Sequence, residues 1–354
     1  MNATAIMTPR EPTGSTTRYA IDFDALQQLP DLAGEPAFRA RQLWEGLYPQ
    51  RRPLDEITNI ARTLRAQLET ALPYALSEVT KQQGDGGDTT KWLWRTGDGA
   101  QVETVLMEYR DRATVCVSSQ AGCAMGCTFC ATGQAGFERQ LRPGEIIEQV
   151  MRAAHASNRR ASNVVFMGMG EPLANFDAVQ QSIERLHSDA GFSARHITVS
   201  TVGVIPGMRA LADQPLPVTL AVSVHAPDDE LRNELVPLNR RYPLSDVIDA
   251  ARDYAARKGR RVTFEYAGIR GVNDDAERAR KLARLLQDVP GGAHVNLIPL
   301  NATAAFTGGP SADDRLRAFA ATLGAHGVTA TIRRNRGVDI DAACGQLRAR
   351  AKSV

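Results

Sequence analysis

Residues 123–130 read Cys123-Ala-Met-Gly-Cys127-Thr-Phe-Cys130, and the rest of the chain is best understood outward from this stretch. These residues hold three of the five cysteines, and the other two are Cys116 and Cys344. Three thiolates on a glycine-containing loop can bind three irons of a [4Fe–4S] cluster and leave the fourth iron without a protein ligand. Clusters that only transfer electrons usually have all four irons bound by cysteine. The triplet therefore predicts a cluster with an open iron that is available for substrate chemistry.

Zinc and disulfide bonds are the competing explanations of these cysteines. Structural zinc usually takes four ligands in paired spacings, and only Cys127 and Cys130 form such a pair here. Residues 1–19 are polar and lack the apolar stretch of a secretory signal, so we expect a cytoplasmic protein with few disulfides. No apolar run approaches the length of a membrane span, so no membrane association is expected. A cluster is favoured over zinc, and zinc over inert buried thiols.

The length of 354 residues, with 43% apolar residues, suits one large domain with a small appendage. Residues 1–17 are expected to form a flexible tail and residues 21–75 to form helices, and a strand–turn–strand pattern covers residues 91–107. We therefore predict two domains. Residues 1–95 contain the tail, a helical accessory domain and the first hairpin strand, and residues 96–354 form the core domain.

A net charge of +2 does not by itself indicate a nucleic-acid partner. Arginines nevertheless gather in residues 39–65, and basic residues gather again in residues 333–352. Solvated helix faces and a nucleic-acid surface both explain such groups, so both interpretations remain open.

From residue 114 onward, strand and helix patterns alternate. Six strands are expected, at residues 114–118, 163–167, 196–200, 218–225, 261–266 and 294–299. Helices are expected from Pro143, at residues 244–258 and at residues 276–286, and a last helix is expected to be capped by Ser311 with Asp314. This order predicts an α/β protein whose parallel sheet is either open or curled into a partial (β/α)6 barrel.

Functional side chains of such folds lie at the C-terminal ends of the strands, and polar clusters follow the predicted strands here. The turn Gly168-Met-Gly-Glu-Pro172 lets backbone approach a ligand closely, and Glu171 could bind an ammonium group. Three further strands end in polar residues, namely Ser200, Ser223, His225 and Asn301. Each feature has an ordinary structural alternative: a tight turn for the glycines, a hydrogen-bonded buried ring for His225, and a turn residue for Asn301.

Cys344 lies among small residues in Gly337-Val-Asp-Ile-Asp-Ala-Ala-Cys344-Gly-Gln346. Such a segment suits a loop that brings a thiol close to other backbone. Cysteine is also among the most buried residue types, so local sequence alone slightly favours a buried, inert thiol.

Together these motifs resemble the RlmN/Cfr family of radical S-adenosylmethionine (SAM) methyltransferases, which act on adenine in RNA. The triplet has the spacing typical of radical SAM enzymes. Further matching strings are Cys116-Val-Ser-Ser-Gln-Ala-Gly-Cys123, Gly168-Met-Gly-Glu-Pro172, Ser223-Val-His225-Ala-Pro227, His294-Val-Asn-Leu-Ile-Pro299 and Asp341-Ala-Ala-Cys344-Gly-Gln-Leu347. The likeness extends from about Phe38 to Leu347 and is greater to the RlmN branch, which methylates carbon 2 of adenine, than to the Cfr branch, which methylates carbon 8.

The resemblance implies one [4Fe–4S] cluster and two SAM molecules per turnover. It implies that Cys344 carries a methyl group to the base, that Cys116 resolves a covalent RNA adduct as a disulfide forms, and that Glu103 accepts a proton. On residues alone, Glu103 would be an exposed strand carboxylate. The implied cluster ligands are Cys123, Cys127 and Cys130, and the implied SAM contacts are Gly170, Glu171, Ser200, Ser223, Val224, His225 and Asn301.

The implied substrates are 23S rRNA, at an adenosine of the peptidyl-transferase centre, and tRNA, at the adenosine beside the anticodon. A monomer and an electron donor such as flavodoxin are also expected. Two departures from the family pattern are the absence of a proline after Asn301 and the string Phe137-Glu-Arg-Gln-Leu141, where the family usually has asparagine before leucine.

Two alternatives from the sequence remain. A Cfr-type enzyme shares the catalytic motifs and differs in the carbon that it methylates. A non-catalytic iron–sulfur or zinc RNA-binding module is the alternative from another class, and Cys116 and Cys344 argue against it because such a module needs neither thiol.

Overall fold

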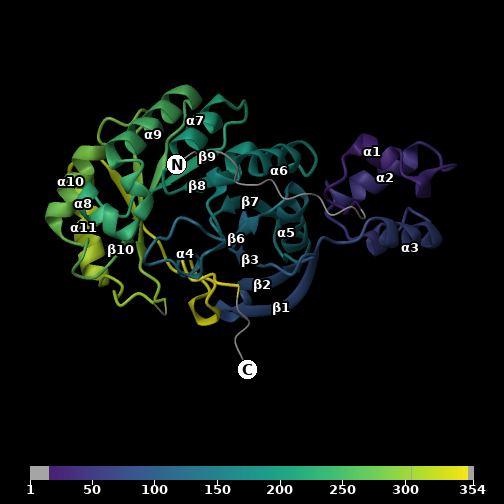
Figure 1. Ribbon diagram of the computed structural model, residues 1–354, viewed down its shortest axis with the longest axis horizontal. Helices are drawn as coiled ribbons and strands as arrows, with labels where there is room; N and C mark the ends of the chain where they lie inside the picture. The colour runs from purple at the N-terminus through teal and green to yellow at the C-terminus, as the bar shows by residue number, and fades with distance from the viewer. Residues whose placement is uncertain (1–15, 304, 350–354) are drawn as a thin grey trace.

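A computed structural model describes residues 16–303 and 305–349 of the chain. Ten strands form one sheet in the order β1-β2-β3-β4-β7-β8-β9-β10-β11-β12, and β5 pairs separately with β6. Figure 1 shows most of this sheet curled into the larger part of the molecule with helices outside it, whereas α1, α2 and α3 form a lobe at the other end. The predicted α/β barrel with a helical accessory region is therefore confirmed.

The accessory lobe consists of short helices. These are α1 (Phe23–Gln27), α2 (Phe38–Leu47) and α3 (Arg62–Ala71), with single 3₁₀ turns at Pro30–Leu32 and Leu54–Glu56. The helices expected in residues 21–75 are present but interrupted, because Pro30, Pro36 and Pro53 cannot continue a preceding helix. Of the predicted tail, residues 1–15 lie outside the described part of the chain.

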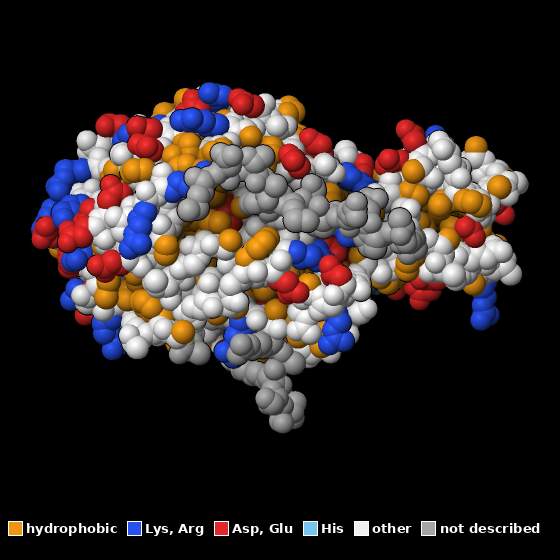
Figure 2. Space-filling model, viewed as in Figure 1, with side chains coloured by type: hydrophobic (Ala, Val, Ile, Leu, Met, Phe, Trp, Pro, Cys, Tyr) orange, Lys and Arg blue, Asp and Glu red, His pale blue; other side chains and the backbone are white. Residues whose placement is uncertain are grey.

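Some arginines of the lobe bind protein rather than solvent. Arg51 donates to the carbonyls of Ala161 (2.7 Å) and Ala190 (3.3 Å), and its guanidinium stacks 4.1 Å from the Phe192 ring centroid. These contacts join the lobe to the barrel, so Arg51 has a structural role. In Figure 2 acidic and basic side chains are mixed over the barrel helices, while apolar side chains are prominent on the lobe.

An antiparallel unit leads into the barrel. It consists of β1 (Leu76–Gly84), β2 (Thr89–Thr96) and β3 (Gln101–Glu108), and β3 pairs antiparallel with β4 (Ala113–Cys116). The predicted hairpin of residues 91–107 is confirmed, and β1 was not predicted. The proposed domain boundary between residues 95 and 96 falls near the end of β2, so both proposed parts contribute strands to one sheet.

The remaining strands run parallel to β4. They are β7 (Ala161–Phe166), β8 (Ile197–Thr201), β9 (Thr219–Ser223), β10 (Thr263–Gly268), β11 (His294–Pro299) and β12 (Thr329–Ile332). All six predicted strands are present, with small shifts at their ends. The edge strand β12 was not predicted, because its sequence Thr-Ala-Thr-Ile is short and weakly apolar.

Helices cross between these strands. The longer ones are α5 (Pro143–His155), α6 (Phe176–Ser188), α7 (Ile205–Asp213), α9 (Leu244–Lys258), α10 (Ala276–Leu286) and α11 (Asp313–Ala325), and shorter elements are α4 (Ala131–Ala135), α8 (Asp229–Leu235), β5 (Gln120–Gly122) and β6 (Phe137–Gln140). Pro143 stands at the start of α5 as predicted. In the described part of the chain, no helix combines the length and apolar character needed to cross a membrane.

The predicted cap of the last helix is wrong. Ala312, not Ser311, is the residue before α11 and makes no side-chain cap, although Oδ1 of Asp314 accepts the N–H of Arg315 in the first turn over 2.9 Å. The Ser311 hydroxyl instead donates to Oδ2 of Asp274 over 2.6 Å. Asp274 is buried, so its carboxylate requires hydrogen-bond donors, and Arg315 also donates to it over 2.9 Å. Ser311 therefore joins α11 to the loop before α10.

Candidate active site

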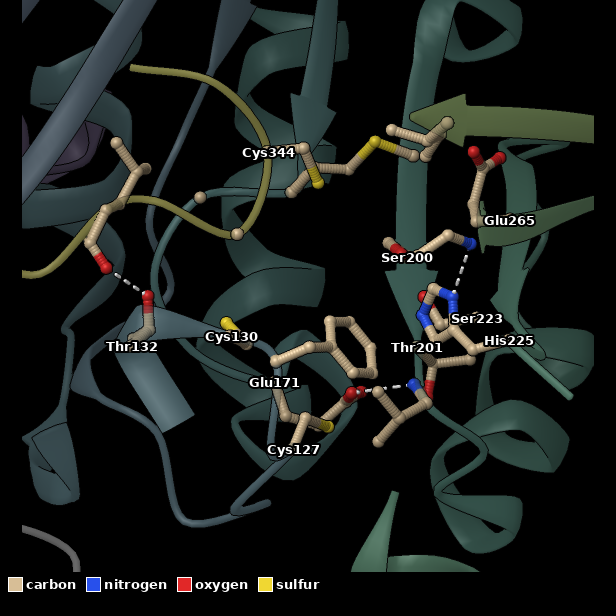
Figure 3. Close-up of a pocket in the computed structure, with 18 of the residues that line it drawn as sticks. Cys127, Cys130, Thr132, Glu171, Ser200, Thr201, Ser223, His225, Glu265 and Cys344 are labelled. Atoms are coloured by element: carbon tan, nitrogen blue, oxygen red, sulfur yellow. Dashed lines mark hydrogen bonds between the residues drawn. The ribbon is translucent and has the colours of Figure 1, made fainter. Parts of the chain in front are cut away.

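A cavity lies at the C-terminal ends of the parallel strands and brings together most of the predicted functional residues. Its lining includes Cys127, Cys130, Gly170, Glu171, Ser200, Ser223, His225, Asn301 and Cys344. In Figure 3, cluster-loop residues lie on one side, strand-end residues lie on the other, and Cys344 enters from the C-terminal loop. Cys116, Cys123, Val224 and Glu103 are not among the residues that line the cavity.

The loop of the cysteine triplet is held in shape by glycines and backbone hydrogen bonds. Gly122 has φ +72°, and a Cβ there would lie 2.1 Å from the Gly136 carbonyl oxygen, so only glycine fits. The next N–H, that of Cys123, donates to the same carbonyl over 2.7 Å. The triplet thus leaves the small β5–β6 sheet at a defined angle and turns toward the cavity.

The donor set of this loop fits a cluster. Burial raises the pKa of Cys123 to about 12, and burial together with the neighbouring thiols Cys130 and Cys123 raises the pKa of Cys127. Within residues 16–303 and 305–349, no three His, Cys, Asp or Glu side chains converge as they would around one metal ion. A [4Fe–4S] cluster needs no such convergence, because each thiolate binds a different iron. Cys127 and Cys130 face the cavity, where an open iron would meet a ligand.

The turn after β7 requires its glycines. A Cβ on Gly168 would lie 2.8 Å from the Val117 carbonyl oxygen, and a Cβ on Gly170, at φ +98°, would lie 2.5 Å from Cβ of Gln120. The side-chain oxygen of Gln120 accepts the N–H of Glu171 over 2.7 Å. The turn therefore packs directly against the loop that carries the triplet.

Glu171 is a buried carboxylate that faces the cavity. Its Oε1 accepts the N–H of Leu173 over 3.1 Å, and its Oε2 accepts the N–H of Val202 over 2.9 Å. Burial raises the pKa of Glu171 to about 7 despite these donors. A cation in the cavity would restore its charge, which suits the binding of an ammonium group.

His225 combines a structural position with an open ring edge. Its Nδ1 accepts the Ala267 N–H over 3.0 Å, so the proton of the neutral ring lies on Nε2. Burial and the nearby Arg232 lower the pKa of His225 to about 3, which keeps the ring neutral. Its backbone has φ +58°, a strained value for a non-glycine residue, and Asn273 binds its carbonyl over 2.8 Å. His225 therefore presents a fixed N–H donor at the cavity.

The other predicted SAM contacts differ in whether their polar groups are already hydrogen-bonded to protein. The hydroxyls of Ser200 and Ser223 line the cavity and have no hydrogen-bond partner among the described residues. Val224 is fully buried in the core, and its N–H donates to the Glu265 carbonyl over 3.0 Å. Asn301 donates its amide N–H to the Cys344 carbonyl over 2.9 Å and accepts from Asn335 over 2.6 Å. Asn301 thus holds the C-terminal loop in this state.

Cys344 is exposed, whereas local sequence slightly favoured a buried thiol. Its side chain is accessible from the cavity. The surrounding protein raises its pKa to about 12, and nearby Cys116, Cys130 and Glu265 add to the rise. Cys116, the last residue of β4, is itself buried. Cys344 therefore lies close both to Cys116 and to a member of the triplet.

Glu103 is buried and not an exposed strand carboxylate. Its Oε1 lies 3.0 Å from Nζ of Lys91, and its Oε2 accepts the N–H groups of Arg348 (2.9 Å) and Ala349 (3.3 Å). The structure thus places Glu103 against the backbone that follows Cys344.

Glu265 is a cavity residue that sequence reasoning missed. It lies on β10, is buried, and accepts the side-chain N–H of Asn296 over 2.7 Å. An ionisable residue inside the apolar strand pattern Thr263-Phe-Glu-Tyr266 was the available signal. Thr132 of α4 was also missed, and its hydroxyl donates to the Leu347 carbonyl.

One protein-family model and several known proteins are similar to this chain. Residues 117–283 match the model of the radical SAM superfamily. The chain is 52% identical to "Probable dual-specificity RNA methyltransferase RlmN" of Parafrankia sp. (strain EAN1pec), with 89% of this chain and 87% of the relative covered. It is 46% identical to "Dual-specificity RNA methyltransferase RlmN" of Anaeromyxobacter sp. (strain Fw109-5), with 96% and 93% covered. A crystal structure of a radical SAM methyltransferase from Sphaerobacter thermophilus matches with TM-score 0.88 and 49% identity, over 94% of this chain and 99% of that one.

Proposed function

The chain belongs to the RlmN family of radical SAM RNA methyltransferases, and from this premise we propose that it methylates carbon 2 of adenosine in 23S rRNA and in tRNA. The sites would be the adenosine of the peptidyl-transferase centre and the adenosine beside the anticodon. The observation that carries the proposal is the position of Cys344, which lines the same cavity as Cys130 and is held there by the hydrogen bond from the Ala131 N–H to the Gly345 carbonyl over 2.8 Å. Cys116 is an electrostatic neighbour of Cys344. A thiol that carries the methyl group must lie near the cluster loop, where SAM is cleaved, and near a second thiol that can release the product.

The proposed cofactors are one [4Fe–4S] cluster on Cys123, Cys127 and Cys130, and SAM. When bound, the cluster supplies the electron that cleaves SAM to a carbon-centred radical. Glu171 would bind the amino group of SAM, because its carboxylate is buried at the cavity wall beside the triplet. The remaining proposed contacts are Gly170, Ser200, Ser223, Val224, His225 and Asn301.

The chemistry of the base explains why a methylated thiol is needed. Carbon 2 of adenine lies between two ring nitrogens and is electron-poor, so it cannot attack a methyl group as a nucleophile. In the proposed sequence the Cys344 thiol first accepts a methyl group from one SAM. The carbon-centred radical from a second SAM would then remove one hydrogen atom from this S-methyl group. The methylene carbon then bonds to carbon 2 and joins protein to RNA.

Release of the product requires a second thiol and a base. The radical adduct must then give up one electron, for which the cluster, oxidised when SAM is cleaved, would be the acceptor, and Glu103 would accept the proton of carbon 2. The Cys116 thiolate then attacks the Cys344 sulfur, the sulfur–carbon bond breaks, and the released carbon takes up a proton to become the new methyl group. Oε2 of Glu103 accepts the N–H groups of Arg348 and Ala349 in this state, so that segment must move before Glu103 acts.

We also propose a monomer in the cytoplasm that takes electrons from a donor such as flavodoxin. The test of the function is nucleoside mass spectrometry after turnover of anaerobically reconstituted protein with SAM, reductant, unmodified 23S rRNA fragment and tRNA. Formation of 2-methyladenosine supports the proposal and shows which RNA is preferred. Formation of 8-methyladenosine would assign the chain to the Cfr-type activity, and no methyladenosine from iron-loaded, SAM-cleaving protein would overturn the proposal.

A further inference from the structure

A buried ion pair lies beside the candidate active site, between the two strands of the hairpin. Nζ of Lys91 on β2 lies 3.0 Å from Oε1 of Glu103 on β3, and the side chains are 7% and 2% exposed. Lys91 is paired with Val105 and Glu103 with Leu93, so the two charges are diagonal neighbours on one face of the sheet. A pair this deeply buried needs further hydrogen bonds to offset its desolvation.

Both charges find those hydrogen bonds in the C-terminal loop. Nζ of Lys91 donates to the carbonyl of Asp341 over 3.3 Å. Oε2 of Glu103 accepts the N–H groups of Arg348 and Ala349. The ion pair thus holds the loop three residues before Cys344 and again four residues after it. Across the same two ends, the Arg348 guanidinium lies 3.6 Å from Oδ2 of Asp341.

The middle of the loop is held from the opposite side. The N–H of Ala131, next to Cys130 of the triplet, donates to the Gly345 carbonyl over 2.8 Å, and Asn301 donates to the Cys344 carbonyl over 2.9 Å. The cluster loop and the segment after β11 therefore hold the middle of the C-terminal loop at the cavity, while the ion pair binds the two ends of that loop.

We infer that Lys91 is a positioning residue, which together with Glu103 fastens both ends of the loop that carries Cys344. This inference rests on the proposed function, in which Cys344 must reach a hydrogen-abstracting radical and then an RNA base. Without the ammonium group, the Asp341 carbonyl loses its hydrogen bond to Lys91, and the buried Glu103 carboxylate loses its counter-charge. Hydration of that carboxylate would then compete with its hydrogen bonds to Arg348 and Ala349.

The test is amide hydrogen exchange of residues 341–349 in the cluster-loaded protein, for wild type, Lys91→Met and Glu103→Gln. Methionine preserves the length and apolar stem of lysine without its charge. We expect exchange in this segment to accelerate by about tenfold to a hundredfold in Lys91→Met, as for loss of hydrogen bonds to charged groups. Glu103→Gln should show the same direction. Lys81→Met, an exposed lysine on the neighbouring strand β1, is the matched control and should leave the segment unchanged.

A second readout separates positioning from stability. In Lys91→Met, iron content should be retained, and the ratio of 5′-deoxyadenosine formed to methyl groups delivered to RNA should rise, because Cys344 is no longer held where hydrogen is removed. Wild-type exchange of residues 341–349 in both Lys91→Met and Glu103→Gln would overturn the inference. So would accelerated exchange with a wild-type product ratio. If wild-type protein forms no methyladenosine, the proposed function fails, and the exchange data still decide whether the ion pair holds the loop.

Discussion

Ala131 donates its backbone N–H to the carbonyl of Gly345 over 2.8 Å, and this bond joins the residue after Cys130 to the residue after Cys344. The two loops lie more than two hundred residues apart in the chain, yet this backbone contact joins them directly. The Thr132 hydroxyl donates to the Leu347 carbonyl and adds a second link two residues farther along the C-terminal loop. The proposed methyl carrier is therefore held directly by the segment that would bind the cluster.

The proposed methyl carrier can be tested by Cys344→Ala. Cys344 lies outside the triplet, so the variant should retain its iron and should form no methylated adenosine, because no thiol can carry the methyl group. Iron analysis and nucleoside mass spectrometry measure the two outcomes. Normal methylation by this variant would exclude the thiol-bound mechanism.

The proposed resolving role can be tested by Cys116→Ala. Without the second thiol the RNA adduct should persist, visible as a nuclease-sensitive band of higher mass on a denaturing gel. The double variant Cys116→Ala/Cys344→Ala is the control and should give no such band, because the attachment point is missing. Full turnover by Cys116→Ala with no adduct would assign resolution to another group.

The close approach of the turn after β7 predicts a cost for Gly170→Ala. The added Cβ would meet Gln120 at 2.5 Å in a backbone conformation with φ +98°. We expect a loss of about 1–3 kcal/mol of unfolding free energy, from strain and overpacking together. Gly191→Ala is a matched control, because Gly191 has φ +70° and no atom within 4 Å of an added Cβ. Urea unfolding followed by circular dichroism compares the two, and equal losses would show that packing against Gln120 does not matter.

A buried carboxylate between β1 and α5 predicts a pH effect on stability. Glu148 accepts the N–H groups of Ala75 (2.7 Å) and Leu76 (3.1 Å), and burial raises its pKa to about 7. Since the ordinary value is about 4.3, the folded state binds this proton more tightly than the unfolded chain does. The resulting stabilisation is complete at low pH and is lost as the pH rises from about 4.3 to 7.

The variant Glu148→Gln, which has no charge to gain, should therefore lose less unfolding free energy than wild type between about pH 5 and 7.5. Urea unfolding of both proteins across this range measures the difference. Parallel pH profiles would mean that Glu148 does not bind its proton more tightly in the folded state.

Sequence alone determined the features that depend on local pattern. The spacing of Cys123, Cys127 and Cys130 could be interpreted directly because these residues lie on one loop. The six strands of the parallel sheet could be predicted because apolar periodicity and turn residues are local properties. The strand-end rule also placed Glu171, Ser200 and His225 at one edge of the sheet before their contacts were known.

Only the tertiary structure decided which distant groups meet. Lys91, Glu103 and Asp341 carry no shared local signal, and their contact depends on how the hairpin packs against the C-terminal loop. The edge strand β12 and the cavity position of Glu265 likewise depend on neighbours supplied by other segments. Local sequence slightly favoured a buried, inert Cys344. It could not show that the side chain is exposed, because the accessibility of a residue is set by the surrounding fold. Hydrogen bonds and burial between segments far apart in the chain leave no periodic trace in the sequence, so those relationships appeared only when the chain was folded.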